Sequence, residues 1–335
     1  MSKNQIKTEY MYSTPRFRYA EGKMLTRDEL YTLCEAQNTF EIADKLVAKG
    51  NDLKNSDGGY ELDLIADKIF LDSFLFVSEV SETPLVYDIF KYPYDCHNLK
   101  SAIKCNIRGV DPMPLMYSCG SVDPVCAVNA INDGENSWYP QNMRDAITEA
   151  SEAYAKTKNP QLIDIILDKA CYADMLACAQ SSGSEYLLSA VKTKIDISNI
   201  LLCDRVMRMQ GEYTREVVFN MAFIEGGDIS RDTLTDMLSL TRHDLADKLA
   251  NTKYYLISRV LFDEKSTLWM LEKAADDTVM ELARASKSIS FGIEVAAGYI
   301  IARETEAKNI RILINGKKNG DAPQSIRERL RVSYE

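Results

Sequence analysis

The chain has 335 residues, 46% of them hydrophobic and 27% charged, an ordinary composition for a globular protein of two or three domains. Its 40 Lys and Arg against 50 Asp and Glu give a formal charge of −10. This balance argues against nucleic acid as the main partner and against direct docking on anionic lipid, because both are bound through clustered basic residues. The longest apolar runs, such as 295–301, fall far short of the roughly 18 residues that span a bilayer, so we expect no direct membrane insertion.

Cysteine and histidine are the residues in which metal or nucleophile chemistry would first be sought. The eight cysteines follow no apolar signal-peptide core, so we expect free thiols in a cytosolic protein. Cys96, His97 and Cys105 could be imagined as zinc ligands, but paired Cys-x-x-Cys or His-x-x-x-His spacing is absent, and His243 is the only other histidine. Gly316-Lys317 lacks the remaining residues of a phosphate loop. We therefore expect no metal, no cofactor and no catalytic residue.

Three segments carry the signals of a helix start. Thr26 and Glu29 have the spacing of a capping box, in which a hydroxyl and a carboxylate bind free amides of the first turn. Asp123 precedes Pro124, and proline at the first helical position costs no hydrogen bond. Ser230 stands before a third segment of this kind. We predict that helices begin directly after Thr26, Asp123 and Ser230.

Between these starts the spacing of apolar residues is helical. They recur at threes and fours, for example in the 268–282 segment, and no alternating strand pattern bounded by hairpin turns is present. The chain is therefore predicted to be all-α. Breaks are expected at 109–114 and at Gly226-Gly227, and the polar loop 132–137 should join two helices. Near the end, Gly316 is the predicted helix C-cap, and a short basic helix should run from Pro323 through Leu330.

A short motif occurs three times along the chain: an acidic residue, then asparagine three positions later, then an apolar residue. The first two copies are 101 residues apart. Residues three apart share a helix face, so the acid and the asparagine of one copy can join a single hydrogen-bond network. The motif residues are Asp95 and Asn98, Asp196 and Asn199, and Glu306 and Asn309.

A second marker, an acidic residue followed by lysine, lies upstream of each motif. The segment 43–46 also recurs letter for letter at 246–249. From these intervals we predict an internal threefold repeat of about 100 residues, with domains 1–112, 113–224 and 225–335. We interpret the repeated polar residues as structural rather than as a ligand site, with the three lysines as counter-charges. The markers are Asp67-Lys68, Asp168-Lys169 and Glu272-Lys273.

The C-terminal stretch resembles a known family. Residues 302–312 (ARETEAKNIRI), continuing through Gly316-Lys317 to the 326–330 segment, have the order found in the C subunit of bacterial and archaeal V/A-type rotary ATPases. That protein is related to the d subunit of the eukaryotic vacuolar enzyme. The opening segment 12–30 and the threefold helical pattern are also similar to this family, so the resemblance covers nearly the whole chain.

This resemblance implies a non-catalytic adaptor. Family members are all-α funnels of three pseudo-equivalent helical wedge domains, seated on the cytoplasmic face of the membrane rotor ring. Such an adaptor would link central-stalk subunits of the D and F type to the ring and would transmit torque for ATP-coupled transport. The coupled ion, proton or sodium, and the direction, synthesis or hydrolysis, stay open. The protein would be cytoplasmic and peripheral on the membrane through the rotor ring.

The basic C-terminal segment is the candidate contact surface for these partners. Residues 301–335 hold eight Lys and Arg against five Asp and Glu, although the chain as a whole is acidic. An uneven field of this kind orients docking more than it adds affinity. A solvated basic tail is an equally good interpretation. The candidate contact residues are Lys317, Lys318, Arg327, Arg329 and Arg331.

Two other classes of protein stay open. A soluble helical-repeat scaffold unrelated to any ATPase would share the repeat pattern, although solenoids usually repeat at about 20 to 50 residues. A helical metalloenzyme would need carboxylates and histidines brought together from several helices. Neither class accounts for the C-terminal match.

Overall fold

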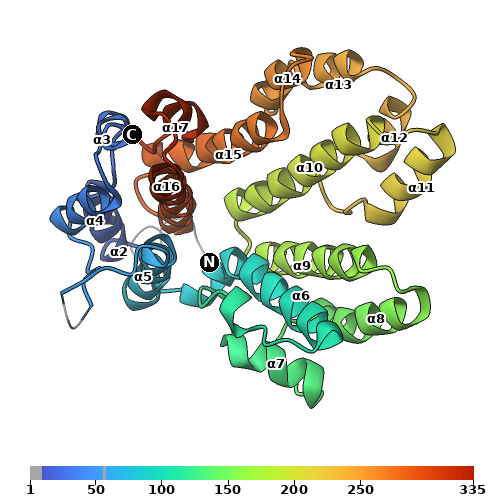
Figure 1. Cartoon of the computed structure of the whole chain (residues 1–335), viewed down its shortest axis with the longest axis horizontal. Helices are drawn as coiled ribbons and strands as arrows, with labels where there is room; N and C mark the ends of the chain where they lie inside the picture. The colour runs from blue at the N-terminus through green and yellow to red at the C-terminus, as the bar shows by residue number, and fades with distance from the viewer. Residues whose placement is uncertain (1–9, 56–57) are drawn as a thin grey trace. The chain divides into compact units, whose positions relative to one another are not determined.

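The computed structural model describes residues 10–55 and 58–335, and in these ranges the regular structure is helical apart from one isolated bridge between Lys54 and Tyr60 (Figure 1). The prediction of an all-α chain is confirmed. The chain forms two compact units. Unit 1 combines the segment up to Pro84 with the segment from Leu249 onward, and unit 2 comprises Leu85–Lys248.

Unit 1 is organised around one long helix, α16 (Ile293–Asn319). This helix packs against helices from both ends of the chain, with α5 and α15 as its main neighbours and α2, α3, α4 and α17 around them (Figure 1). The other helices of the unit are α2 (Ser13–Glu21), α3 (Arg27–Cys34), α4 (Thr39–Ala48), α5 (Ile65–Val80), α14 (Tyr255–Phe262), α15 (Leu268–Ala285), η3 (Ser286–Ser288) and α17 (Pro323–Arg329).

The core of unit 1 joins residues that are far apart in the sequence. Phe17 of α2, Phe76 of α5 and Tyr299 of α16 form a cluster of three rings with centroids 5.5 to 5.7 Å apart. Burying a large apolar side chain such as Phe17 stabilises the fold by about 1.5 to 3 kcal/mol. The helices at the two ends of the chain are therefore parts of one hydrophobic core.

Unit 2 is a layered set of helices in which α9 (Gln161–Ser181) packs against α8, α6 and α10. α6 also contacts α7, and α10 contacts α11 and α12. The remaining elements are η1 (Pro84–Phe90), α6 (Tyr92–Arg108), η2 (Met113–Leu115), α7 (Pro124–Asn132), α8 (Gln141–Thr157), α10 (Glu185–Met207), α11 (Glu212–Ala222), α12 (Arg231–Met237) and α13 (Arg242–Leu249), of which η1 and α13 reach the unit boundaries.

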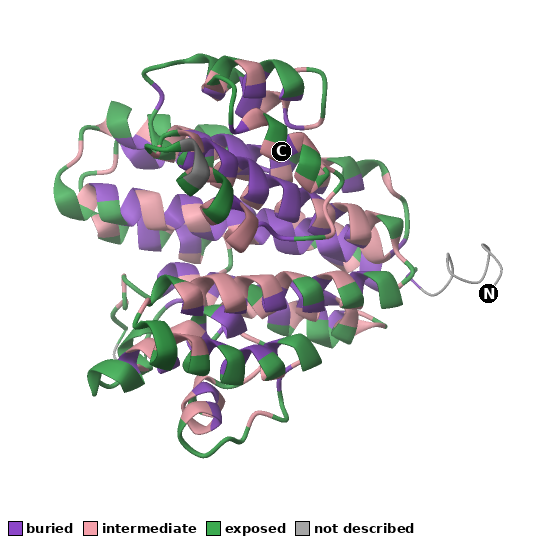
Figure 2. Ribbon diagram, turned by 90° about the vertical axis from the view of Figure 1, so that its right-hand side faces the viewer, coloured by how far each residue is buried: buried purple, intermediate pink, exposed green. Residues whose placement is uncertain are grey.

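Buried residues follow the faces on which helices meet (Figure 2). In α8 the buried positions Met143, Ala146, Ile147 and Ala150 recur at threes and fours, and this stripe lies on a helix that packs against α9. The same periodicity that predicted helices from the sequence therefore also marks the faces that pack.

The three predicted helix starts are confirmed. Thr26 and Glu29 form a complete capping box, with the Glu29 amide donating to the Thr26 hydroxyl and the Thr26 amide to the Glu29 carboxylate. Asp123 caps α7 by accepting from the Val125 amide at 2.9 Å, and Ser230 caps α12. The short basic helix is α17, and the loop predicted at 132–137 follows the last residues of α7.

The predicted end of the long helix at Gly316 is wrong. α16 continues to Asn319 and is capped by Gly320, whose φ of 72° is the left-handed conformation that glycine favours. A Cβ on Gly316 would lie 2.7 Å from Cγ1 of Ile326, so this glycine lets α17 approach α16 closely. Both glycines follow an asparagine, and only the packing of α17 separates their roles.

No described helix is both long and apolar enough to cross a membrane. The predicted boundaries at 112/113 and 224/225 separate repeats in the sequence. The two units are instead defined by which residues pack together, and their boundaries lie at 84/85 and 248/249. The threefold division stays a prediction.

Candidate functional site: acid–asparagine clasps and a basic segment

The repeated acidic and asparagine side chains lie on the three long helices α6, α10 and α16, and all of them are at most 6% exposed. Burying a carboxylate or a carboxamide costs free energy unless its polar atoms find partners. Each pair finds them in the backbone of nearby loops. We call each pair, with the backbone groups it binds, an acid–asparagine clasp.

The first clasp lies in unit 2. Asp95 accepts hydrogen bonds from the Ser121 hydroxyl (2.5 Å), the Ser121 amide (3.1 Å) and the Val122 amide (3.2 Å). One turn later, Asn98 donates to the Tyr117 carbonyl at 2.8 Å and accepts from the Tyr117 amide at 2.9 Å. Both side chains therefore bind the loop that precedes α7.

The second clasp, also in unit 2, repeats this arrangement on the loop that precedes α12. Asp196 accepts from the amides of Asp228 and Ile229, both at 3.0 Å. Asn199 donates to the Ile224 carbonyl at 2.7 Å and accepts from the Ile224 amide at 2.9 Å. The reciprocal pair of bonds from asparagine to one backbone residue is the same as in the first clasp.

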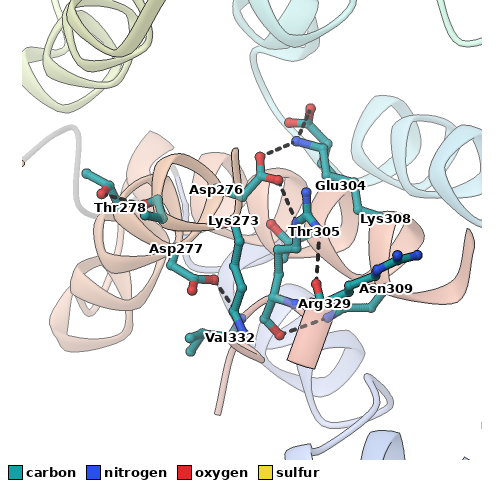
Figure 3. A network of polar contacts seen from close by, with 12 residues as sticks. Lys273, Asp276, Asp277, Thr278, Glu304, Thr305, Lys308, Asn309, Arg329 and Val332 are labelled. Atoms are coloured by element: carbon teal, nitrogen blue, oxygen red, sulfur yellow. Dashed lines mark hydrogen bonds and ion pairs between the residues drawn. The ribbon is translucent and has the colours of Figure 1, made fainter. Parts of the chain in front are cut away.

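The third clasp lies in unit 1 and takes its backbone groups from both ends of the chain. Glu306 accepts from the Leu25 amide at 2.6 Å, across 281 positions of sequence. Asn309 donates to the Arg331 carbonyl at 3.2 Å and accepts from the Arg331 amide at 2.8 Å. Figure 3 shows Asn309 beside the neighbouring network, in which Asp276 contacts Lys308 and Asp277 accepts from the Val332 amide.

All three clasps place a helix start. In each, the acidic side chain accepts from the amide of the residue directly before the N-cap of a short helix, and the asparagine binds both the amide and the carbonyl of one other residue, Tyr117, Ile224 or Arg331. The amide donors are Val122 before Asp123, Ile229 before Ser230, and Leu25 before Thr26. The chemistry of the motif is thus to dock one helix start on another helix by charge-assisted hydrogen bonds.

Whether the acid of a clasp is aspartate or glutamate depends on the size of the loop residue that faces it. Gly120 and Gly227 each stand two positions before the amide donor, and a Cβ there would lie 2.2 Å from Oδ1 of Asp95 or 2.0 Å from Oδ1 of Asp196. The corresponding residue before Leu25 is a lysine, and there the acid is a glutamate, which is longer by one methylene. The shorter aspartate therefore requires glycine in the facing loop.

Burial has the largest effect on the pKa of Asp95, the carboxyl group of the first clasp. It raises the pKa of Asp95 to about 6, while the bonds from Ser121 and Val122 act in the opposite direction and the charge of Asp88 adds a smaller rise. Between about pH 4 and pH 6 the folded chain therefore binds more protons at Asp95 than the unfolded chain does. The free energy of unfolding should fall across this window as the pH rises, by up to about 3 kcal/mol.

Asp95→Asn removes this titration and tests it. We expect the advantage of the wild type over the variant, in free energy of unfolding, to be about 2 kcal/mol larger at pH 4.5 than at pH 7. Urea unfolding at both pH values measures it. Asp145→Asn, at an exposed position of α8, is the matched control and should show a much smaller change. Equal pH dependence of the two variants would contradict the interpretation.

The acid-lysine markers make different contacts from those expected. Asp67 pairs with Arg311 in unit 1, and Asp168 pairs with Lys100 at 2.5 Å in unit 2. In both cases the basic residue stands two positions after the asparagine of a clasp. Lys273 donates to the Glu328 carbonyl at 2.8 Å, and Glu272 is exposed.

The expectation that the marker lysines provide counter-charges for the clasps is wrong. Neither Lys68, Lys169 nor Lys273 bonds to a clasp side chain in the part of the chain that the structure describes. The clasp carboxylates are satisfied mainly by amide groups, because a loop backbone lies against each of them. Burial lowers the pKa of Lys169.

The five basic residues of the C-terminal segment all have partners within unit 1. Lys317 donates to the Cys34 carbonyl at 2.5 Å, Lys318 pairs with Asp63, and Arg327 pairs with Glu35 at 3.0 Å. The last two make the following ion pairs: Arg329 with Asp321 at 3.6 Å, and Arg331 with Asp276 at 2.8 Å. Four of the five charges are thus opposed by a carboxylate of the same chain.

The side chains considered for zinc do not converge. Cys96 is buried and donates to the Leu167 carbonyl, whereas His97 is exposed, bonds the Leu115 carbonyl and contacts the Tyr117 ring at a tilt of 54°. Among the described residues, no three His, Cys, Asp or Glu side chains gather in a way that could hold a metal ion.

A family model described as ATP synthase (C/AC39) subunit matches residues 13–329. The chain belongs to this family. It is similar to the C subunit of the V-type sodium ATPase of Enterococcus hirae, at 26% identity over 335 residues that cover 98% of this chain and 99% of that protein.

Archaeal relatives of this family are also similar over nearly their whole length. They include the C subunit of the A-type ATP synthase of Methanobrevibacter smithii, at 23% identity over 94% of this chain and 86% of that protein. The same A-type ATP synthase protein of Thermococcus gammatolerans is 23% identical over 96% of this chain and 89% of its own length. The family resemblance inferred from the C-terminal stretch is confirmed, and the matched residues 13–329 span the positions of all three motifs in this chain.

Sequence reasoning missed one member of the third clasp. Arg303 is 7% exposed, pairs with Glu306, and donates to the Asn51 side-chain oxygen at 3.0 Å. A basic residue three positions before a repeated acid on one helix face could have indicated this pair. The residues three positions before the other two acids, Tyr92 and Thr193, are uncharged. This AC39-family chain therefore carries a buried ion pair of this kind in one clasp of the three.

Proposed function

We propose that the chain is the non-catalytic adaptor that links the central stalk of a V/A-type rotary ATPase to its membrane rotor ring and transmits torque between them. The observation that carries this proposal is the family match over residues 13–329, together with coverage of 99% of the Enterococcus hirae protein. On this proposal its partners are D- and F-type stalk subunits and the rotor ring, and it is cytoplasmic and peripheral on the membrane.

The clasps support the further proposal that the chain contains three pseudo-equivalent helical wedges arranged as a funnel. Three motifs with the same spacing make the same kind of bond, from a long helix to the loop before the next short helix. Asp95 and Asp196 each bind the loop before the short helix that follows them in the chain. Glu306 binds the loop before α3, near the start of the chain, in the same way. A coupler of rotation needs helices fixed to one another in this way, because a loose joint would absorb torque.

A pull-down tests the proposed function. The tagged protein, expressed in its native host, should recover stalk, ring and nucleotide-binding subunits from detergent-solubilised membranes, and the eluate should hydrolyse ATP. Hydrolysis measured with and without Na⁺ addresses the coupled ion, since the Enterococcus hirae relative is named for sodium. Untagged membranes are the control. Recovery of the protein alone, or with unrelated soluble partners, would overturn the proposal in favour of a helical-repeat scaffold.

We also propose that the basic C-terminal segment contributes to partner contact at Lys318 and Arg329. Their side chains are 36% and 52% exposed despite their ion pairs, and exposed pairs are weak, about 0 to 1 kcal/mol. Charge reversal of both should reduce the ATPase subunits recovered in the pull-down several-fold at low salt, with less effect at high salt. Arg259→Glu with Lys265→Glu, at exposed positions of the same unit, is the matched control. Unchanged recovery would contradict a contact with partners at these two residues.

A further inference from the structure

A cleft of about 530 Å³ in unit 1 has an unusual charge for an acidic chain. It lies between α3, α15 and the segment after α17, and its lining includes four basic side chains and two carboxylates. Its apolar lining comes from Leu30, Tyr31, Leu330 and Val332. We call it the Arg27 cleft. Its charged lining residues are Arg27, Lys273, Arg284, Arg331, Asp277 and Glu335.

Three of the four cations in the Arg27 cleft lack an ion pair with any described carboxylate. Arg27 donates to the Tyr31 hydroxyl at 3.1 Å, Lys273 to the Glu328 carbonyl at 2.8 Å, and Arg284 to the Ser333 carbonyl at 2.5 and 3.1 Å. All three acceptors are neutral. These contacts hold the side chains in place without a direct ion pair, in contrast to Lys318, Arg327, Arg329 and Arg331. The Asp277 carboxylate near Lys273 and the Glu335 carboxylate near Arg27 act on these cations only from a longer distance.

The two carboxylates of the cleft are occupied by other donors. Asp277 accepts from the Val332 amide at 2.8 Å, and burial raises its pKa. Glu335 accepts from the Arg27 amide at 2.6 Å and from the Ser333 hydroxyl at 3.1 Å. These bonds hold the extended segment 330–335 against α15 and α3. The cleft keeps a surplus of positive charge while the chain as a whole carries −10.

We infer that the Arg27 cleft binds an acidic segment of a partner protein in the complex, with carboxylates as the groups recognised. This inference rests on the proposed function, which supplies a multi-subunit complex in which such a segment would be found. Guanidinium groups bind carboxylates through parallel N–H donors, and two of the three uncompensated cations are arginines. The cations are already ordered by neutral acceptors, so binding loses less side-chain entropy than it would for free lysines and arginines.

The form of the cleft favours a peptide segment over a lipid surface. The cations surround a recess with an aromatic wall: the guanidinium carbons of Arg27 and Arg327 lie 5.1 and 4.9 Å from the centre of the Tyr31 ring. A flat bilayer cannot enter a recess. It would contact the exposed surface around the cleft, on a chain whose net charge is negative. A narrow acidic segment can enter the recess and meet a lining in which four basic side chains outnumber two carboxylates.

The direct test measures binding of a fluorescein-labelled hexaglutamate peptide by anisotropy at low salt. The cleft variant Arg27→Glu, Lys273→Glu, Arg284→Glu should bind it at least about tenfold more weakly than the wild type, with the wild-type affinity falling as salt screens the charges. Lys54→Glu, Arg259→Glu, Lys265→Glu changes the net charge equally at exposed positions of the same unit and should bind as the wild type does. Arg27→Gln with Lys273→Gln, which leaves Arg284 and its bonds to Ser333 in place, should show an intermediate loss.

Each outcome decides the inference. Equal losses in the cleft and control variants would indicate general charge attraction, and stronger binding to phosphatidylglycerol vesicles than to the peptide would indicate a lipid site. Either result overturns the inference, provided that thermal unfolding shows the variants to be folded. The same variants in the pull-down separate the two proposals: recovery of the ATPase by wild type and cleft variant alike contradicts the cleft alone, whereas no recovery by the wild type contradicts the proposed function.

Discussion

Glu306→Leu should lower the free energy of unfolding by about 3 to 5 kcal/mol, because it leaves the buried Arg303 guanidinium without its carboxylate. The side chains of this pair are 8% and 6% exposed, so both charges are largely shielded from water. The Leu25 amide also loses its acceptor, which leaves the start of α3 free to move away from α16. Urea unfolding at pH 7 measures the loss.

A double variant distinguishes the ion pair from the packing around it. Arg303→Met with Glu306→Leu removes both charges at similar volume and should recover most of the loss, to within about 2 kcal/mol of the wild type, since no buried charge is left and the groups that lose a partner, the Leu25 amide and the Asn51 side-chain oxygen, are neutral. Glu79→Gln, which breaks the exposed pair between Arg16 and Glu79, should cost less than about 1 kcal/mol. A double variant as unstable as Glu306→Leu would show that the buried charges do not dominate the energetics of this clasp.

Gly227→Ala should destabilise unit 2 by about 2 to 4 kcal/mol. The added Cβ would lie 2.0 Å from Oδ1 and 3.0 Å from Cγ of Asp196, which is itself held by the amides of Asp228 and Ile229. Relief requires either an off-rotamer carboxylate or a displaced loop, and each sacrifices bonds to a buried charge. Thermal and urea unfolding would show the loss.

Gly22→Ala is the matched control for this substitution. Its φ is −65°, and the nearest atom to a new Cβ is the Tyr19 carbonyl oxygen at 3.4 Å, so alanine should be tolerated within about 0.5 kcal/mol. Gly120→Ala, which faces Asp95, should resemble Gly227→Ala. If Gly227→Ala were as mild as Gly22→Ala, the proposed match between aspartate length and glycine would be incorrect.

The local features of the fold could be predicted because their physical causes are local. The capping box at Thr26 and Glu29, the Asp123-Pro124 start and the Ser230 cap depend on residues within one helical turn, and all three are present. The end of α16 could not be placed. Gly316 and Gly320 are equally good caps by sequence, and the choice depends on Ile326 of α17 packing against Gly316.

The candidate site was predictable in its residues and only partly in its contacts. The repeated acids and asparagines were recognisable from spacing, and burial of all six could be expected from a shared helix face. Their partners could not be inferred, because a backbone amide has the same chemistry at every position and leaves no mark in the sequence. Lys273, which was assigned as a counter-charge, illustrates the limit, since it donates to the Glu328 carbonyl instead of to a clasp.

The sequence by itself determined the helical class, the starts of the short helices, the thrice-repeated polar pair and the family, because periodicity, capping and motif order are properties of neighbouring residues. Tertiary structure alone decided that Glu306 binds Leu25 across 281 positions, and that Arg27, Lys273 and Arg284 remain without ion pairs to described carboxylates while most of the basic C-terminal segment is neutralised. Charge compensation and backbone hydrogen bonding depend on which groups lie within about 3 Å of one another, and only the packed chain sets those distances.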